Sequence, residues 1–128
     1  MTIRIVRLGT PRAADEGLRI GTVRRPPRGV PKSEFASRDY YDVWYPALSP
    51  TPELVAQAQG ATDDKAWRAF VRHFRKEMNE PEPSRTLDLL AALSHQTSFS
   101  LGCYCEDEAH CHRSVLRELL AARGAKIA

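Results

Sequence analysis

The sequence predicts an α/β fold in three layers, with a central, mainly parallel β-sheet and helices on both faces. Segments rich in β-formers alternate with amphipathic helical segments along the chain, which is the pattern of such folds. At 128 residues the chain is long enough for one domain with its own core. The hydrophobic share of 42% and the charged share of 27% are typical of globular proteins. We therefore expect residues 1–128 to form a single domain.

Four segments have the composition of strands. Residues 3–8 and 18–23 alternate apolar and polar side chains and are followed by turn-forming residues. Residues 40–45 are rich in aromatic and β-branched side chains, and residues 98–103 alternate again. These four segments supply the predicted sheet.

Four further segments have the pattern of helices. Residues 52–59 begin with a proline, which suits the first turn of a helix. Residues 62–78 repeat apolar side chains at helical spacing, and Pro81 is expected to end this helix. Another helix is expected over residues 84–95, capped by its first residue, and a last amphipathic helix is expected to end at Gly124.

We expect a cytoplasmic protein that does not enter a membrane. No apolar run approaches the roughly 18 residues that a membrane-spanning helix needs. Residues 1–7 alternate like a strand and lack the apolar region of a signal peptide. The three cysteines are an odd number, which argues against a disulfide framework, and in the cytoplasm they should be mostly reduced.

Positive charge is concentrated in the first part of the chain. The formal net charge is +3, and residues 1–48 hold nine Lys and Arg against five Asp and Glu. The local source is the run from Arg24 to Lys32, which contains four cations and no acid. This run is either a solvated basic loop or an anion-binding loop, because binding loops in parallel sheets follow the strands.

The three cysteines lie together in what the pattern predicts to be a turn between the last strand and the last helix. Cys103, Cys105 and Cys111 are followed directly by His112 and Arg113. The first turn of a helix carries unpaired N–H groups and a partial positive charge, which bind anions and stabilise a thiolate. The acidic run at 106–108 opposes anion binding unless its side chains face outward.

This placement predicts a site with defined roles. Cys105 or Cys111 is the expected nucleophile, and His112 is the expected proton carrier. The guanidinium of Arg113, with Arg24 or Arg25 from the basic loop, is the expected anion clamp, so the two loops should lie close together.

Four interpretations of the cysteine turn stay open. A catalytic thiolate beside an anion clamp resembles cysteine phosphatases and sulfurtransferases, but their loop has five residues between cysteine and arginine, whereas seven separate Cys105 and Arg113. A zinc site from Cys103, Cys105, Cys111 and His112 has suitable ligand types. A reversible disulfide would sense oxidants. Alternatively, the cysteines are small hydrophobic residues that only pack.

We expect no metal ion and no other cofactor. Cys111 and His112 are sequential, so on a regular helix their side chains diverge by about 100° and could not both bind one ion. A domain of this size also folds without a metal.

Three motifs resemble a known family, the bacterial domain of unknown function 488. They are Arg24-Arg25-Pro-Pro-Arg28-Gly, Tyr41-Asp-Val-Trp-Tyr-Pro46, and Cys103-Tyr-Cys-Glu106 with Cys111-His-Arg113. They occur in family order and cover nearly the whole chain. The resemblance implies a small cytosolic α/β protein of one domain, and it names no reaction.

The resemblance also implies which residues family members share. They are an arginine after an early strand, here Arg24 or Arg25, and a turn that corresponds here to Cys105, Glu106, Cys111, His112 and Arg113. Many members lack a counterpart of Cys103, which weakens a four-ligand metal site.

The combined expectation is an anion-binding pocket of Cys, His and Arg side chains. One hypothesis is a cysteine-dependent enzyme that acts on a phosphorylated or other small anionic substrate. The alternative is a module that binds a nucleotide or nucleic acid without chemistry, for which the aromatic side chains of residues 40–45 could stack on a base. The sequence leaves open which of the two is correct.

Overall fold

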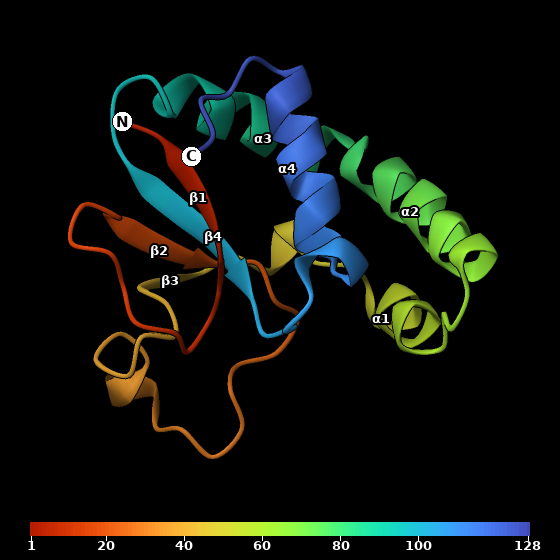
Figure 1. Cartoon of the computed structure of the whole chain (residues 1–128), viewed down its shortest axis with the longest axis horizontal. Helices are drawn as coiled ribbons and strands as arrows, with labels where there is room; N and C mark the ends of the chain where they lie inside the picture. Colours follow the sequence, from red (N-terminus) through yellow and green to blue (C-terminus); the bar gives the residue numbers. More distant parts are fainter.

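The protein has an α/β fold built on one parallel sheet of four strands (Figure 1). The structure is a computed structural model and describes all 128 residues. The strand order is β1-β4-β2-β3. The strands are β1 (Ile3–Arg7), β2 (Leu18–Gly21), β3 (Val43–Trp44) and β4 (Phe99–Cys103). The α/β class and the parallel sheet predicted from the sequence are confirmed, although the third strand has only two residues.

Four α-helices accompany the sheet: α1 (Pro52–Gln59), α2 (Asp64–Met78), α3 (Pro81–Leu93) and α4 (His112–Ala122). The side chain of Asp63 caps α2 by accepting a hydrogen bond from the N–H of Ala66 at 2.7 Å. The helix predicted to end before Pro81 does end there, at Met78, but the expectation that the next helix begins at Ser84 is wrong. Pro81 is the first residue of α3, because a proline needs no hydrogen-bond acceptor in the first turn. No helix combines the length and apolar character that crossing a bilayer requires.

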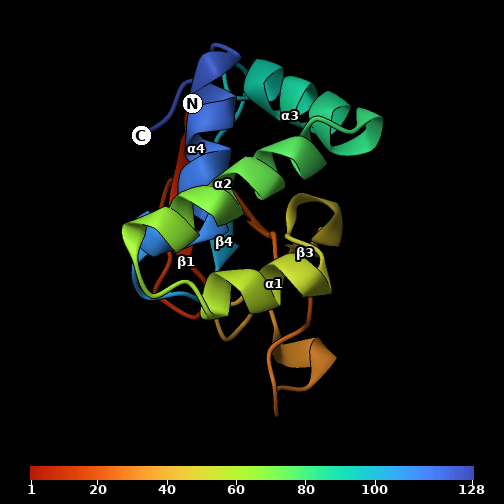
Figure 2. The same ribbon diagram turned by 90° about the vertical axis from the view of Figure 1, so that its right-hand side faces the viewer.

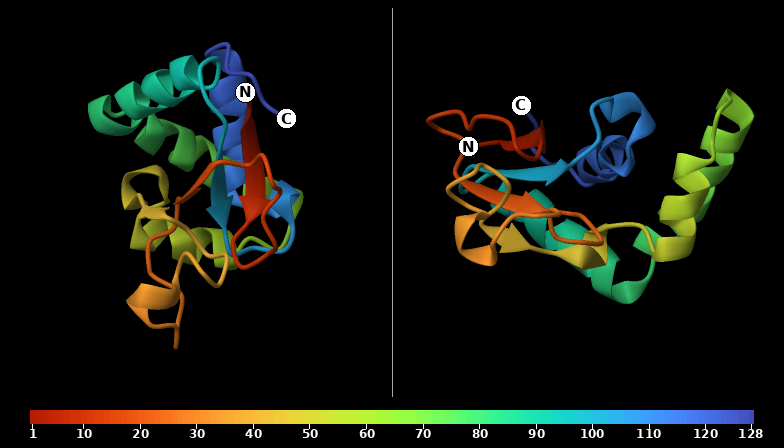
Figure 3. Two further views of the ribbon diagram at one scale, coloured as in Figure 1. Left: turned by 90° about the vertical axis from the view of Figure 1, so that its left-hand side faces the viewer. Right: turned by 90° about the horizontal axis from the view of Figure 1, so that it is seen from below.

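The helices all lie on one side of the sheet, so the prediction of helices on both faces is wrong. Seen from one side the helices stand in front of the strands, and seen from the opposite side the strands stand in front (Figures 2 and 3). The main core lies between these two layers and includes buried side chains of β1, β4, α2, α3 and α4.

The direction of the connections explains this asymmetry. The chain runs outward across the sheet from β1 to β2 and β3, and then returns to β4 and to the β1 edge, where Ile127 pairs with Ile3. Parallel crossovers are right-handed, so outward and returning connections lie on opposite faces. All four α-helices belong to the returning connections. The outward connections, residues 8–17 and 22–42, contain no α-helix and cover the second face as loops.

Two glycines allow these loops to lie directly on the sheet. A Cβ on Gly21 would come within 2.4 Å of the ring of Tyr41, and one on Gly102 would come within 2.4 Å of Leu8. Tyr41 and Leu8 belong to a second, smaller cluster of buried side chains that also contains Cys103 and Cys111. Two cysteines of the turn therefore pack against side chains of the loops that cover this face.

A buried ion pair fixes the first loop to the sheet. The guanidinium of Arg19, on β2, donates to both carboxylate oxygens of Glu16 at 2.7 and 2.9 Å, and both side chains are buried. Arg19 also donates to the carbonyls of Thr10 and Asp39, and Ser100 on β4 donates to Glu16. Although burial disfavours its charged form, hydrogen bonds from Arg19 and Ser100 lower the pKa of Glu16 to about 2.

The topology places a crevice at the carboxyl end of β4. The connection after β4 leaves toward α4 on the helix side, whereas those after its neighbours β1 and β2 leave on the loop side. Ligands of open α/β sheets bind where connections diverge in this way. Cys103 is the last residue of β4, so the cysteine turn begins at this point.

Candidate functional site

The cysteine turn joins β4 to α4, as the sequence predicts. A short 3₁₀ segment, Glu108–His110, follows the strand, and Cys111 is the N-terminal flanking residue of α4. His112 and Arg113 are the first two residues of that helix. Val115, Leu116 and Leu120 are buried in the main core, and they fix the helix in this position.

The three thiols form one group with unequal access to solvent. Cys103 and Cys111 are buried, with 7% and 2% of their surface exposed, whereas Cys105 is exposed. The sulfur atoms of Cys103 and Cys105 are 3.8 Å apart. All three are free thiols. Cys105 is thus the thiol that solvent can reach, whereas the other two are buried.

The surroundings of Cys105 favour its thiolate form. Hydrogen bonds from Cys103 and then from Cys111 lower the pKa of the Cys105 thiol, and the positive charge of Arg113 acts in the same direction. The same contacts raise the pKa of Cys103 and Cys111, and burial adds to that rise. The surroundings therefore favour the charged form at the exposed Cys105 and the neutral form at the buried Cys103 and Cys111.

His112 is buried and uncharged at neutral pH, because burial lowers its pKa to about 4. Its Nε2–H donates to the carbonyl of Thr22 at 2.6 Å. This contact leaves Nδ1 unprotonated, and Nδ1 lies 3.8 Å from the sulfur of Cys111. The imidazole therefore offers a lone pair to the thiol group, on the side away from Thr22.

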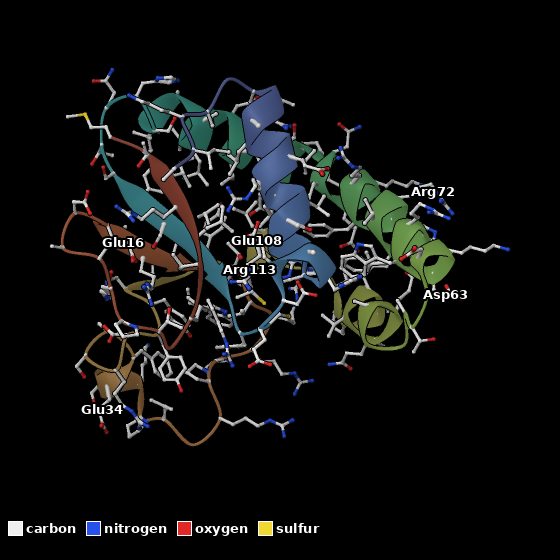
Figure 4. The ribbon with its side chains drawn as sticks, viewed as in Figure 1. Glu16, Glu34, Asp63, Arg72, Glu108 and Arg113 are labelled. Carbon is white, nitrogen blue, oxygen red and sulfur yellow. The ribbon has the colours of Figure 1, made fainter.

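Arg113 is used within the turn itself. Its side chain is buried, and Nη2 donates to the carbonyl of Cys105 at 2.7 Å (Figure 4). Its Nε is also buried and has no hydrogen-bond partner. Arg113 therefore positions the backbone that carries Cys105, and it does so from the first turn of α4.

The basic loop and the cysteine turn are neighbours, as expected. The hydroxyl of Tyr104 donates to the carbonyl of Arg25 at 2.9 Å. Arg24 donates to the carbonyls of Ser49 and Pro50, so its guanidinium holds the chain before α1. Arg25 and Arg28 are exposed, and neither forms an ion pair within the chain.

A groove of about 1120 Å³ connects these features. The thiols, both histidines of the turn and the basic loop line it together. Its lining includes the following side chains: Arg24, Arg25, Arg28, Tyr40, Trp44, Cys103, Tyr104, Cys105, His110, Cys111 and His112. Of the six site residues predicted from the sequence, five line this groove. The sixth, Arg113, does not line it but binds the backbone of Cys105.

His110 is a further site residue, which the sequence pattern does not indicate. His110 lines the groove, its Nδ1 contacts a carboxylate oxygen of Asp107 at 2.9 Å, and its Nε2 has no partner in the chain. This imidazole–carboxylate pair is exposed. In the sequence His110 follows Asp107 by three residues, but this spacing brings the two side chains together only in a defined turn.

The acidic run does not occupy the groove. Glu106 is largely exposed and lies 3.7 Å from Arg7, and Glu108 forms an ion pair with Arg117 (Figure 4). None of the three acidic side chains at 106–108 lines the groove. The condition under which an anion can bind at this turn is therefore met.

Three side chains of the turn could hold a metal ion. One ligand atom from each of Cys103, Cys111 and His112 lies within 4.8 Å of the other two. The expectation that Cys111 and His112 diverge is wrong. Cys111 lies outside the helix, with φ of −132° and ψ of 148°, and its extended backbone lets its side chain turn toward that of His112.

The comparisons with known proteins give a family and no activity. No curated protein and no solved structure matches the chain. A family model described as the Active DUF488-N3 subclade matches residues 3–124, which is almost the whole chain and includes both loops of the site. The chain therefore belongs to the DUF488 family.

Proposed function

We propose that the protein is a cysteine-dependent enzyme that acts on a small anionic substrate, such as a phosphate ester, with Cys105 as its nucleophile. One observation carries the proposal. Of the three thiols only Cys105 is exposed, and it is the one whose thiolate the neighbouring groups stabilise, in a groove that also contains free arginines.

The anion clamp comes from the basic loop. Arg25 and Arg28 line the groove and have no carboxylate partner. Arg113 and Arg24 instead bind backbone carbonyls. This division supports the proposal despite the unusual spacing in sequence, because the arginine that binds substrate need not belong to the cysteine turn.

The reaction would proceed through a covalent intermediate. The sulfur of Cys105 attacks the electrophilic centre, a bond forms between them, and the bond to the leaving oxygen breaks with its electron pair. His110, held by Asp107, donates a proton to the leaving oxygen. Water then displaces the sulfur, and His110 takes up the proton of that water.

The binding module stays as the second candidate, because aromatic side chains line the same groove. Trp44 is 44% exposed, and its Nε1 donates to the carbonyl of Val23 at 2.7 Å, which fixes the ring. Tyr40 and Tyr104 contact each other edge to face. Such rings could hold the base of a nucleotide whose phosphates bind the arginines.

Two alkylating reagents of nearly equal size test the proposal. Iodoacetate is anionic and iodoacetamide is neutral, so the ratio of their rates reports the anion clamp, whereas the rate with iodoacetamide alone reports the thiolate. We expect alkylation at Cys105, with a ratio at least about tenfold above that of a free thiol, since two charged contacts favour the anion. Inorganic phosphate should compete with iodoacetate.

Matched variants complete the test. Arg25→Ala with Arg28→Ala should return the ratio to that of a free thiol, whereas Arg38→Ala should leave it unchanged, because Arg38 is exposed but does not line the groove. A slow Cys105 with phosphate still bound would favour the binding module. A normal ratio in the wild type would contradict the anion clamp.

A further inference from the structure

We infer that the cysteine turn is also a binding site for a thiophilic divalent metal ion such as Zn²⁺, with Cys103, Cys111 and His112 as its buried ligands and Cys105 as its fourth. The site goes beyond the proposed reaction and shares one residue with it. A bound ion would coordinate the sulfur of Cys105, which would then no longer be available as a nucleophile.

The distances within the group match tetrahedral coordination. Two sulfur atoms that each lie about 2.3 Å from a tetrahedral ion are about 3.8 Å apart. The sulfur atoms of Cys103 and Cys105 are 3.8 Å apart, and so are the sulfur of Cys111 and Nδ1 of His112. The three buried ligand atoms all lie within 4.8 Å of one another, so small side-chain rotations bring them onto one ion.

The histidine is prepared for coordination. Metal-binding histidines usually donate their second N–H to a carbonyl or carboxylate, which fixes the tautomer. Here Nε2 donates to the carbonyl of Thr22 at 2.6 Å, and the unprotonated Nδ1 faces the sulfur atoms. The ring is also held edge to face by Phe74, at a centroid distance of 5.5 Å.

The ligand set selects the kind of ion. On metal binding Cys103 and Cys111 would release their protons to solvent, and the resulting three thiolates with one imidazole favour Zn²⁺ over Mg²⁺ or Ca²⁺, which prefer oxygen. The residues come from β4, from the turn and from the start of α4, so one ion would link the sheet to the helix layer.

Binding of Co²⁺ to metal-free protein tests this inference without any activity assay. We expect one Co²⁺ per chain, with the strong thiolate-to-metal absorption and the intense visible bands of a tetrahedral sulfur site, and displacement of Co²⁺ by Zn²⁺. A weak spectrum typical of octahedral oxygen ligands, or no binding, would overturn the inference.

Variants identify the ligands. His112→Asn should weaken Co²⁺ binding at least about 100-fold, whereas His110→Asn, two residues away and exposed, should leave it unchanged. Because His112 is buried and its variant could unfold, Cys103→Ser provides a second test with the same expected loss. Cys105→Ser should keep one Co²⁺ per chain but lose about a third of the thiolate absorption, since one thiolate of three is removed. Equal affinity in His112→Asn, or unchanged absorption in Cys105→Ser, would contradict the ligand set.

The two proposals fail separately. Absence of Co²⁺ binding with a reactive Cys105 would remove the metal site and leave the enzyme proposal intact. Tight Co²⁺ binding with an unreactive Cys105 in metal-free protein would remove the enzyme proposal and leave the metal site intact.

Discussion

Two buried polar regions lie at β4, and they differ in how completely their groups are paired. Around Glu16 and Arg19, three further protein groups, the carbonyls of Thr10 and Asp39 and the hydroxyl of Ser100, form hydrogen bonds with the pair, and both charges are satisfied inside the chain. In the cysteine turn, Cys105 is exposed and Nε of Arg113 has no partner. Full pairing is what a structural network requires, whereas incompletely paired polar groups beside a groove are typical of a binding or reaction site.

The largest expected effect comes from removing the charge of Glu16 in the buried pair with Arg19. Glu16→Gln leaves the buried guanidinium of Arg19 without its carboxylate, which should lower the free energy of unfolding by about 3–5 kcal/mol. Chemical denaturation monitored by circular dichroism measures it. A change below about 1 kcal/mol would mean that the pair is not a structural network.

The same variant has a defined pH dependence. The pKa of Glu16 is lowered from 4.5 to about 2 on folding, so its contribution is present above the unfolded pKa and is lost as pH falls through the folded pKa. Wild-type stability should therefore decline between these two values more steeply than that of Glu16→Gln. Equal slopes would contradict the assignment.

The next largest effect concerns the cysteine turn and is a change in the pKa of Cys105. Cys111→Ala removes one of the two thiols that donate to Cys105. A hydrogen bond to a charged group contributes about 1.5–3 kcal/mol, so the pH midpoint of Cys105 alkylation should rise by about one to two units. The rate of iodoacetamide alkylation against pH measures this shift, and an unchanged midpoint would show that Cys111 does not stabilise the thiolate.

A smaller effect tests how closely the loop lies on the sheet. Gly21→Ala places a Cβ within 2.4 Å of the Tyr41 ring and should cost about 1–3 kcal/mol of unfolding free energy. Gly60→Ala is the control, because the nearest atom to its Cβ is 3.6 Å away and its φ is −88°. Equal melting temperatures for the two variants would contradict the close packing.

The smallest effect concerns the surface. Arg75 of α2 pairs with Glu118 of α4, and both side chains are largely exposed. Glu118→Gln should change the free energy of unfolding by less than about 1 kcal/mol and should not affect Cys105. A larger loss in denaturation would mean that this pair, unlike other exposed pairs, holds the helices together.

Much of the fold follows from local patterns that the sequence shows directly. The strands near Ile3, Leu18 and Phe99 and the helix ending before Gly124 lie where periodicity and end signals predict them. The start of α3 was misplaced because Pro81 both ends and begins helices, and only its hydrogen bonds decide which. The one-sided helix layer depends on the direction of each crossover, which no local pattern contains.

The sequence predicts where the site lies but not the role of each of its residues. The turn and the basic loop are predictable from their positions after strands, whereas the partners of each guanidinium are not. Arg24 binds a carbonyl 26 residues away and Arg113 binds a carbonyl of its own turn, and these contacts exist only in the folded chain. The convergence of Cys111 and His112 depends on one extended residue before the helix, which helical geometry alone predicts incorrectly.

The most direct test is the pH dependence of Cys105 alkylation by iodoacetamide in metal-free protein, with the modified residue identified by mass spectrometry. Because the pKa of Cys105 is lowered, we predict a rate that is nearly constant from about pH 6 to about pH 9, with label on Cys105 alone. A rate that rises with a midpoint near the usual value of about 8.5, or label mainly on Cys103 or Cys111, would contradict the reactive thiolate.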